Sequence, residues 1–168
     1  MILRVVALYR RLVTGWSEAW SERKRGIGCL MCSYGPVESD ECGVRVFTGE
    51  FMDAYLWTPG TIRGYTVCIW KRGHVVEASH VDLDSAAGWW REVTMVSAAV
   101  ERVFEPIKLN LETLGNVVPH PYTHVLPRYA GDPFPNDMLP RPYIEKGDKR
   151  NPSDLLSDAE RVRSALAL

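Results

Sequence analysis

The sequence predicts an α+β domain built around a largely antiparallel sheet. Three segments rich in β-branched and aromatic residues come first, at residues 44–49, 52–58 and 64–71, and turn-forming residues separate them. One long amphipathic segment follows at residues 84–104, and two more strand-like segments span residues 107–118 and 122–129. Strands grouped before and after a helix, without regular alternation of the two, are typical of the α+β class.

The segment 84–104 is the clearest helix in the chain. Asp84 or Ser85 is expected to cap its N-terminus, and Pro106 lies just beyond its end. Its apolar face repeats at three- and four-residue steps and consists of Trp89, Val93, Val96, Val100 and Val103.

A basic amphipathic helix is predicted at residues 2–22. Residues 1–25 hold six basic and two acidic side chains, which gives a local charge of +4. Two interpretations stay open, namely binding to a membrane surface and packing on the domain or on a partner subunit. The second is preferred, because Gly15 interrupts the pattern and the tryptophans fit a protein groove equally well.

The C-terminal part predicts a loop followed by a helix. Residues 130–152 contain five prolines, which favour an extended segment. Residues 153–167 predict a helix that docks on the body of the protein or on a second subunit, with one face formed by Leu155, Leu156, Ala159, Val162 and Leu166.

The composition is that of an ordinary globular protein of about one domain. The 168 residues carry a net charge of −1, and 46% are hydrophobic and 24% charged. Without a large basic surplus, nucleic acid is not expected as a partner. No membrane segment is expected either, because the apolar runs are short and no signal peptide is evident. We therefore expect a cytoplasmic protein.

The residue types that bind metals are few. Cys29 and Cys32 form a C-x-x-C pair, which in a reducing compartment favours metal binding or redox chemistry over a structural disulfide. Zinc needs four ligands, and a site made of Cys29, Cys32, His74 and His120 is as consistent with the residues as no site. Of the other candidates, His80 is interpreted as a surface or capping residue and Cys68 as a buried thiol, and Cys42 has no assigned role.

An alternation of aromatic rings marks residues 118–128, "VPHPYTHVLPR". On a strand, His120, Tyr122 and His124 would point to the same face. Such rings are costly to bury unless each has a hydrogen-bond partner.

This stretch resembles the histidine-triad (HIT) superfamily, whose signature is His-φ-His-φ-His-φ-φ followed by Pro-Arg. The similarity covers about residues 27–140. It includes "RGYTVCIWKRGHVVE", the long helix with "IKLNLETLGNVVPH", and the exit "HVLPRYAGDP". Residues 1–26 are then an N-terminal helical extension, and residues 141–168 a proline-rich tail with a helix.

The resemblance implies a HIT-like fold with a five-stranded, largely antiparallel sheet, commonly in a homodimer. Members bind nucleotide phosphates, and family enzymes hydrolyse or transfer nucleotidyl groups. Branches with an N-terminal C-x-x-C bind zinc through it, a histidine like His74 and the first triad histidine. That raises the expectation for zinc at Cys29, Cys32, His74 and His120, where four protein ligands make it structural.

The chain departs from the family at Tyr122, which stands where the nucleophilic middle histidine belongs. Forming a phenolate at pH 7 costs about 4 kcal/mol unless the site lowers the pKa of the phenol. A nearby cation or a helix N-terminus would have that effect. Tyr122 and His124 are therefore the expected catalytic residues, with Tyr122 as nucleophile, general acid or binding residue.

The resemblance also carries expectations for binding residues. The phosphate- or nucleotide-binding set is Asn110, Asn116, His124 and Arg128, although Asn110 fits a turn residue and Arg128 an exposed surface arginine equally well or better. Trp57 occupies the place of an acidic residue that holds ribose hydroxyls in some branches, unless that residue is displaced.

Three functions are consistent with these residues. The first is a divergent nucleotidyl hydrolase or transferase that acts on a phosphate-containing substrate through Tyr122. The second is a non-hydrolytic nucleotide-binding protein, and the third is an enzyme of specialised metabolism on the same fold. The enzyme is slightly favoured because Asn116 and His124 persist around the altered position.

Overall fold

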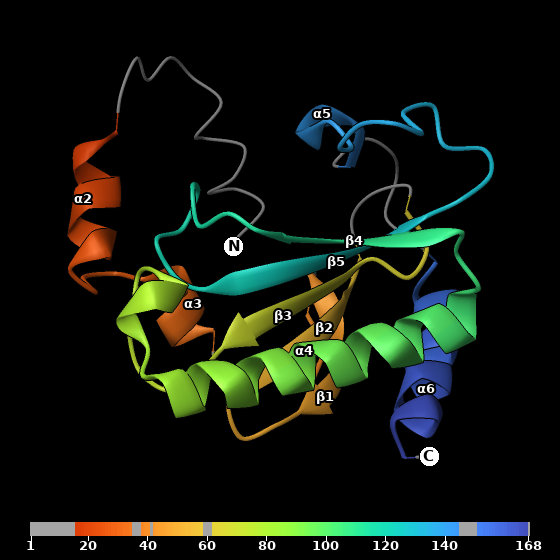
Figure 1. Ribbon diagram of the computed structural model, residues 1–168, viewed down its shortest axis with the longest axis horizontal. Helices are drawn as coiled ribbons and strands as arrows, with labels where there is room; N and C mark the ends of the chain where they lie inside the picture. Colours follow the sequence, from red (N-terminus) through yellow and green to blue (C-terminus); the bar gives the residue numbers. More distant parts are fainter. Residues whose placement is uncertain (1–15, 35–37, 41, 59–61, 145–150, 168) are drawn as a thin grey trace.

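Five antiparallel strands form one sheet in the order β1-β2-β3-β5-β4, as the sequence predicts for an α+β fold (Figure 1). The computed structural model describes residues 16–34, 38–40, 42–58, 62–144 and 151–167. The strands are β1 (Gly43–Thr48), β2 (Met52–Trp57), β3 (Thr66–Trp70), β4 (Lys108–Thr113) and β5 (Tyr122–Arg128). The helices are α2 (Glu18–Lys24), α3 (Leu30–Ser33), the 3-10 helix η1 (Ala78–His80), α4 (Leu83–Phe104), α5 (Arg141–Ile144) and α6 (Pro152–Leu166).

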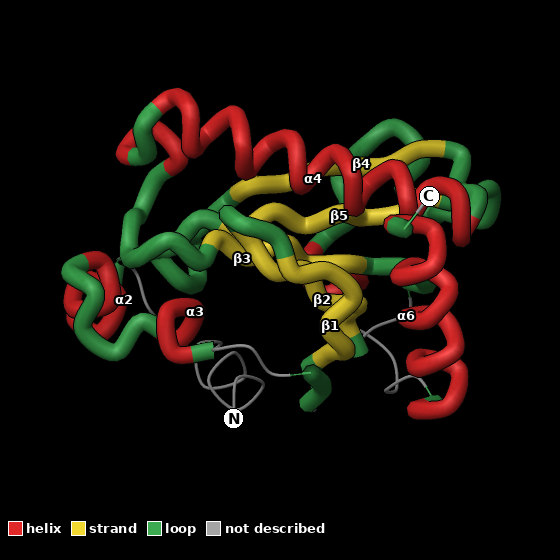
Figure 2. The backbone as a smooth tube through the Cα atoms, turned by 90° about the horizontal axis from the view of Figure 1, so that it is seen from below, coloured by secondary structure: helices red, strands yellow, loops and turns green. Residues whose placement is uncertain are grey.

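Helix α4 covers one face of the sheet, here called the α4 face (Figure 2). Trp89, Val93, Val96 and Val100 are buried as predicted. The predicted cap is wrong, however, because the N-cap is Asp82, whose carboxylate accepts a hydrogen bond from the Ser85 amide at 2.9 Å. Asp82 has the extended backbone that a cap requires, whereas the predicted cap residues lie within the first turn.

Helix α6 packs beside α4 and β1, so of the two predicted docking sites the body of the protein is the one observed. Leu155, Ala159 and Val162 are buried, but Leu156 is 51% exposed, which contradicts its placement on the buried face. Helix α6 therefore shares one core with α4 and the strands. The predicted boundary at residue 140, between the HIT-like domain and the C-terminal tail, stays a prediction.

The opposite face, here called the site face, carries a second apolar cluster. Its sheet residues are Tyr55, Val67, Ile69, Tyr122 and Leu126. Residues 130–144, here called the strap, leave β5 and cover part of this face, and Figure 1 shows α5 across the sheet from α4. The expected extended loop is thus interrupted by a short helix.

The predicted N-terminal helix is described only from residue 16 on, and its part before that lies outside the described residues. Ser17 caps α2 by accepting a hydrogen bond from the Trp20 amide at 3.1 Å. Helices α2 and α3 lie together at the end of the molecule away from α6 (Figures 1 and 2). Within the described residues, no helix combines the length and apolarity needed to cross a bilayer.

Candidate functional site

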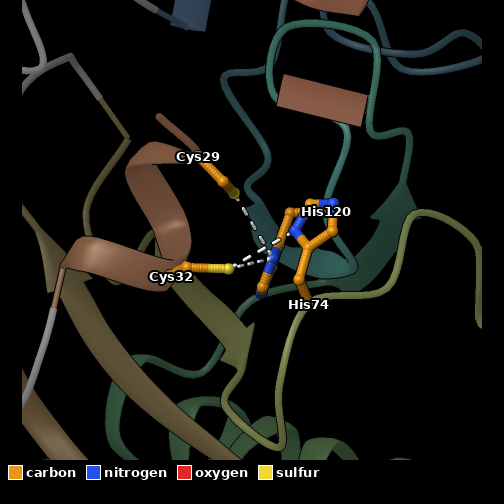
Figure 3. Close-up of side chains that lie close together, drawn as sticks. All are labelled: Cys29, Cys32, His74 and His120. Carbon is orange, nitrogen blue, oxygen red and sulfur yellow. Dashed lines mark hydrogen bonds between the residues drawn. The ribbon is translucent and has the colours of Figure 1, made fainter. Parts of the chain in front are cut away.

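Four side chains predicted as metal ligands converge at one end of the sheet (Figure 3). The ligand atoms of Cys29, Cys32, His74 and His120 all lie within 4.8 Å of one another. His120 Nδ1 is 3.7 Å from Cys29 Sγ and 3.6 Å from Cys32 Sγ, and Cys32 Sγ is 3.4 Å from His74 Nδ1. Zinc–sulfur and zinc–nitrogen bond lengths in a tetrahedron imply ligand separations of about 3.3–3.8 Å, so the residues fit a four-coordinate metal site.

Both histidines are oriented by hydrogen bonds from their outer nitrogens. His120 Nε2 lies 2.8 Å from the Trp70 carbonyl oxygen, and His74 Nε2 lies 3.2 Å from that of Lys24. Each Nε2 therefore carries a proton and donates it to the carbonyl oxygen, which leaves Nδ1 facing the cysteines. Such outer partners are the usual means of fixing metal-binding histidines.

The loop before α3 brings the two cysteines to the histidines. Gly26 and Gly28 have φ values of 84° and 64°, a region that glycine adopts without strain. A Cβ on Gly26 would lie 3.3 Å from the His74 ring, so the loop also needs glycine there for space. Cys29 is buried and Cys32 exposed.

The two thiols differ in pKa. Burial acts to raise the pKa of Cys29, but hydrogen bonds to His120 and Cys32 bring it down to about 6. Burial and the neighbouring Cys29 raise the pKa of Cys32 to about 11. One thiolate is thus already favoured at neutral pH, and a bound cation would stabilise the second.

Tyr122 and His124 lie side by side on the site face. Their ring centroids are 5.1 Å apart in an edge-to-face arrangement, and the ladder pairs Tyr122 with Ile69 and His124 with Val67. His120 does not share this arrangement, which contradicts the expected row of three rings. It precedes β5, which begins at Tyr122, and its imidazole turns to the cysteines.

Burial determines the protonation of this pair. Tyr122 is 4% exposed, and desolvation raises its pKa. The positive charge of Arg141 and a hydrogen bond with the Val118 backbone act to lower this pKa, but their effect is smaller. Desolvation, helped by Arg141, lowers the pKa of His124 to about 4. The site therefore does not lower the phenol pKa as a nucleophile would need, and both rings are neutral at pH 7.

The other predicted binding residues lie at different places. Asn110 pairs with Leu126 and so shares the site face, whereas Asn116 is exposed in the turn before β5. Arg128 is 7% exposed, so its interpretation as an exposed surface arginine is wrong. Its guanidinium pairs with Asp132 and donates to the carbonyl oxygens of Phe134 and, at 2.9 Å, Asp137. These contacts direct it to the strap.

Two residues near His124 were missed in the sequence. The Tyr65 hydroxyl lies 2.6 Å from His124 Nδ1, and the rings of Tyr65 and Trp57 are 6.2 Å apart. Glu112 pairs with His124 in the β4–β5 ladder, and its Oε1 is buried without a hydrogen-bond partner among the described residues. Alternation along β4 from Asn110 would have placed Glu112 on this face, but the sequence offered no signal for Tyr65.

A cavity of about 380 Å³ adjoins the metal-ligand cluster on the site face. Tyr34 and Tyr55 contribute aromatic walls, and Cys32 and His120 line the end next to the cluster. Asp53 also lines it, and its carboxylate accepts a hydrogen bond from Lys71 Nζ at 3.0 Å. The cavity can therefore accept a planar group and has a carboxylate within it.

Comparison with known proteins finds similarity to one family and shows the fold. Residues 53–131 match the HIT domain family. Protein hit of Bacillus subtilis (strain 168) is 29% identical over 112 residues, which cover 63% of this chain and 75% of that protein. A histidine triad protein from Bradyrhizobium japonicum has a TM-score of 0.66 at 19% identity, over 75% of this chain and 92% of that one. A Zn-bound histidine triad family protein from Mycobacterium smegmatis has a TM-score of 0.60 at 21% identity, over 83% and 94%. These structures confirm the HIT-like fold.

Proposed function

Residues 53–131 match the HIT domain family, and on that basis we propose that the chain is a HIT protein that binds a nucleotide-like phosphorylated ligand without forming a covalent nucleotidyl intermediate. The observation that carries the proposal is the state of Tyr122 in the nucleophile's position. Its side chain is 4% exposed and packs in an apolar cluster, while His124 and Asn110 remain on the same face. A phenol enclosed in this way cannot approach a phosphorus atom in line.

The cavity supports a ligand with a planar part. A nucleobase can lie against the aromatic wall that Tyr34 and Tyr55 form together, their rings being in edge-to-face contact at 5.0 Å. Asp53, which lines the cavity from β2, is a suitable acceptor for sugar hydroxyls and takes the role of the acidic residue that Trp57 replaces. The phosphate would extend towards His124, with Asn110 and Asn116 as further donors.

Zinc is the metal that the cluster fits best. Two thiolates and two imidazoles are soft and borderline ligands that select it, and four protein ligands leave no position for water activation. When bound, zinc would hold α3 and the His74 loop to the start of β5. Its role is therefore structural, and the ligands are Cys29, Cys32, His74 and His120.

A second copy of the chain is the proposed partner. β4 is an edge strand of the sheet, and apolar side chains are exposed along it and beside it, with Ile107 75%, Leu111 39% and Leu114 53% exposed. Trp90 and Met95 of α4 are also about half exposed, at 49% and 46%. An open edge flanked by apolar side chains favours association with a second copy.

Hydrolysis or group transfer is the second candidate function, with Tyr122 as a proton donor. The neutral phenol lies against His124, whose Nδ1 is held by Tyr65, so a proton could pass to a leaving group at this point. In this candidate the reacting form is the neutral phenol, and the phenolate left by proton donation is reprotonated by solvent, whereas attack by Tyr122 needs phenolate before the reaction begins.

Three readouts on one set of proteins separate these functions. Wild-type protein should bind AMP in calorimetry, release no mononucleotide from adenosine phosphoramidate or a dinucleoside polyphosphate, and show no added mass. Mononucleotide release by the wild type would favour the second candidate. A nucleotidyl adduct that Tyr122→Phe abolishes would make the phenol a nucleophile and overturn the proposal. Hydrolysis gained only in Tyr122→His would show that the wild-type site binds the substrate but lacks the nucleophile.

A further inference from the structure

The strap brings a cation to the Tyr122–His124 pair. Leu139 is 6% exposed and lies in the same apolar cluster as Tyr122, and Tyr143 and Ile144 pack against that cluster. Tyr143 also contacts Phe134 edge-to-face at 5.6 Å. Arg141 lies between these contacts, at the first position of α5, and its charge acts on both Tyr122 and His124.

The strap is held in place from β5. Arg128, on the site face of that strand, pairs with Asp132 and binds the carbonyl oxygens of Phe134 and Asp137. Asp132 in turn accepts a hydrogen bond from the Phe134 amide at 2.8 Å. With its first half fixed by Arg128 and its second half packed on the cluster, the strap sets the position of Arg141 rather than leaving it to a mobile loop.

Among the described residues next to Tyr122 and His124, side chains other than Arg141 provide little positive charge. A phenol is neutral at pH 7 because its ordinary pKa is near 10, and the His124 imidazole is neutral as well. Glu112 faces His124 from β4 with a buried carboxylate oxygen that lacks a hydrogen-bond partner among the described residues, and its negative charge opposes an incoming anion. A phosphate bound here needs a cation to offset that carboxylate.

We propose that Arg141 is the phosphate-binding residue of the Tyr122–His124 site, and that the strap delivers it. Its planar guanidinium offers two parallel donors that match a pair of phosphate oxygens. His124, which is only partly buried, marks the side from which the anion enters. The assignment rests on the proposed function for the nature of the ligand, but it can be tested with an inorganic anion alone.

The test is titration of the full chain with inorganic pyrophosphate, followed by calorimetry and by the NMR signals of the His124 ring. Arg141→Gln should weaken binding about 10-fold to 100-fold, the range expected for a lost charge-assisted contact. Arg141→Lys should lose less, since it keeps the charge but not the paired donors. Arg91→Gln is the matched control, because Arg91 is an exposed arginine on α4, across the sheet, and should bind as wild type does.

The outcomes separate this assignment from the proposed function. Unchanged binding in Arg141→Gln, an equal loss in Arg91→Gln, or no effect of pyrophosphate on the wild-type His124 signals would each overturn it. Melting temperatures are measured for all variants, so that binding is compared between proteins that remain folded. AMP and adenosine are then compared: the Arg141→Gln loss should appear with AMP and be absent with adenosine. Arg141-dependent binding of pyrophosphate without any binding of AMP would sustain the assignment and overturn the proposed nucleotide function.

Discussion

The two faces of the sheet are stabilised in different ways. The α4 face is covered by two regular helices, α4 and α6, whose apolar side chains form one continuous core with β1, β2 and β3. The site face is covered by segments with little regular structure, namely α3, the turn around Val118 and the strap. Besides its own apolar cluster, it depends on a few specific polar contacts, at the metal-ligand cluster and at Arg128. Burial over a wide area thus supports one face, and individual side chains support the other.

Removing a metal ligand should have the largest effect, because it breaks the site face at its main attachment. Cys29→Ser should abolish stoichiometric zinc and lower the free energy of unfolding by several kcal/mol, since binding of a structural metal is folding free energy. Metal analysis and urea unfolding measure both. The control is Cys68→Ala, which removes a buried thiol from the α4 face and should keep full zinc content. Zinc content that is the same in Cys29→Ser and wild type would refute the cluster as a metal site.

Acid should weaken the site face selectively through His124. Its pKa is about 4 when folded and near 6.5 when unfolded, so the unfolded chain binds the proton first as pH falls. Stability is therefore complete above pH 6.5 and decreases towards pH 4, by at most about 3 kcal/mol. Urea unfolding of wild type and His124→Asn across this range should show the difference, with zinc content checked at each pH. Equal pH dependence in the two proteins would contradict the burial of a neutral imidazole.

A core truncation provides the corresponding test for the α4 face. Val96 is fully buried between α4 and the sheet, so Val96→Ala should lower the free energy of unfolding by about 2 kcal/mol through lost burial and a new cavity. Zinc content and pyrophosphate binding should not change. Leu156→Ala, at an exposed position of α6, is the control and should have almost no effect. A loss of zinc in Val96→Ala would show that the two faces are not independent.

The contrast between the faces also explains what the sequence could predict. Segments rich in β-branched and aromatic residues indicated the strands, and periodic apolar residues indicated α4, because these regular elements bury such residues along their length. The four candidate metal ligands were proposed from the residue types, and the family resemblance strengthened that expectation. The cap at Asp82, the exposure of Leu156 and the direction of Arg128 were not predicted correctly, since each depends on a contact partner rather than on a local pattern. Tyr65, Glu112 and Arg141 reach His124 from three separate segments, and only the fold brings them together.

A single polar contact on the α4 side provides the smallest of the expected effects. Glu92 of α4 accepts hydrogen bonds from the amides of Glu50 at 2.6 Å, Phe51 at 3.1 Å and Met52 at 3.0 Å, and so holds the β1–β2 turn to the helix. Glu92→Gln keeps the shape but replaces a charged acceptor, so a loss of about 1–2 kcal/mol in unfolding free energy is expected. Amide hydrogen exchange should localise the loss to the turn. If Glu92→Gln instead released zinc or altered the His124 signals, the β1–β2 turn would be coupled to the site face through β2. The α4 face and the site face would then not be stabilised independently.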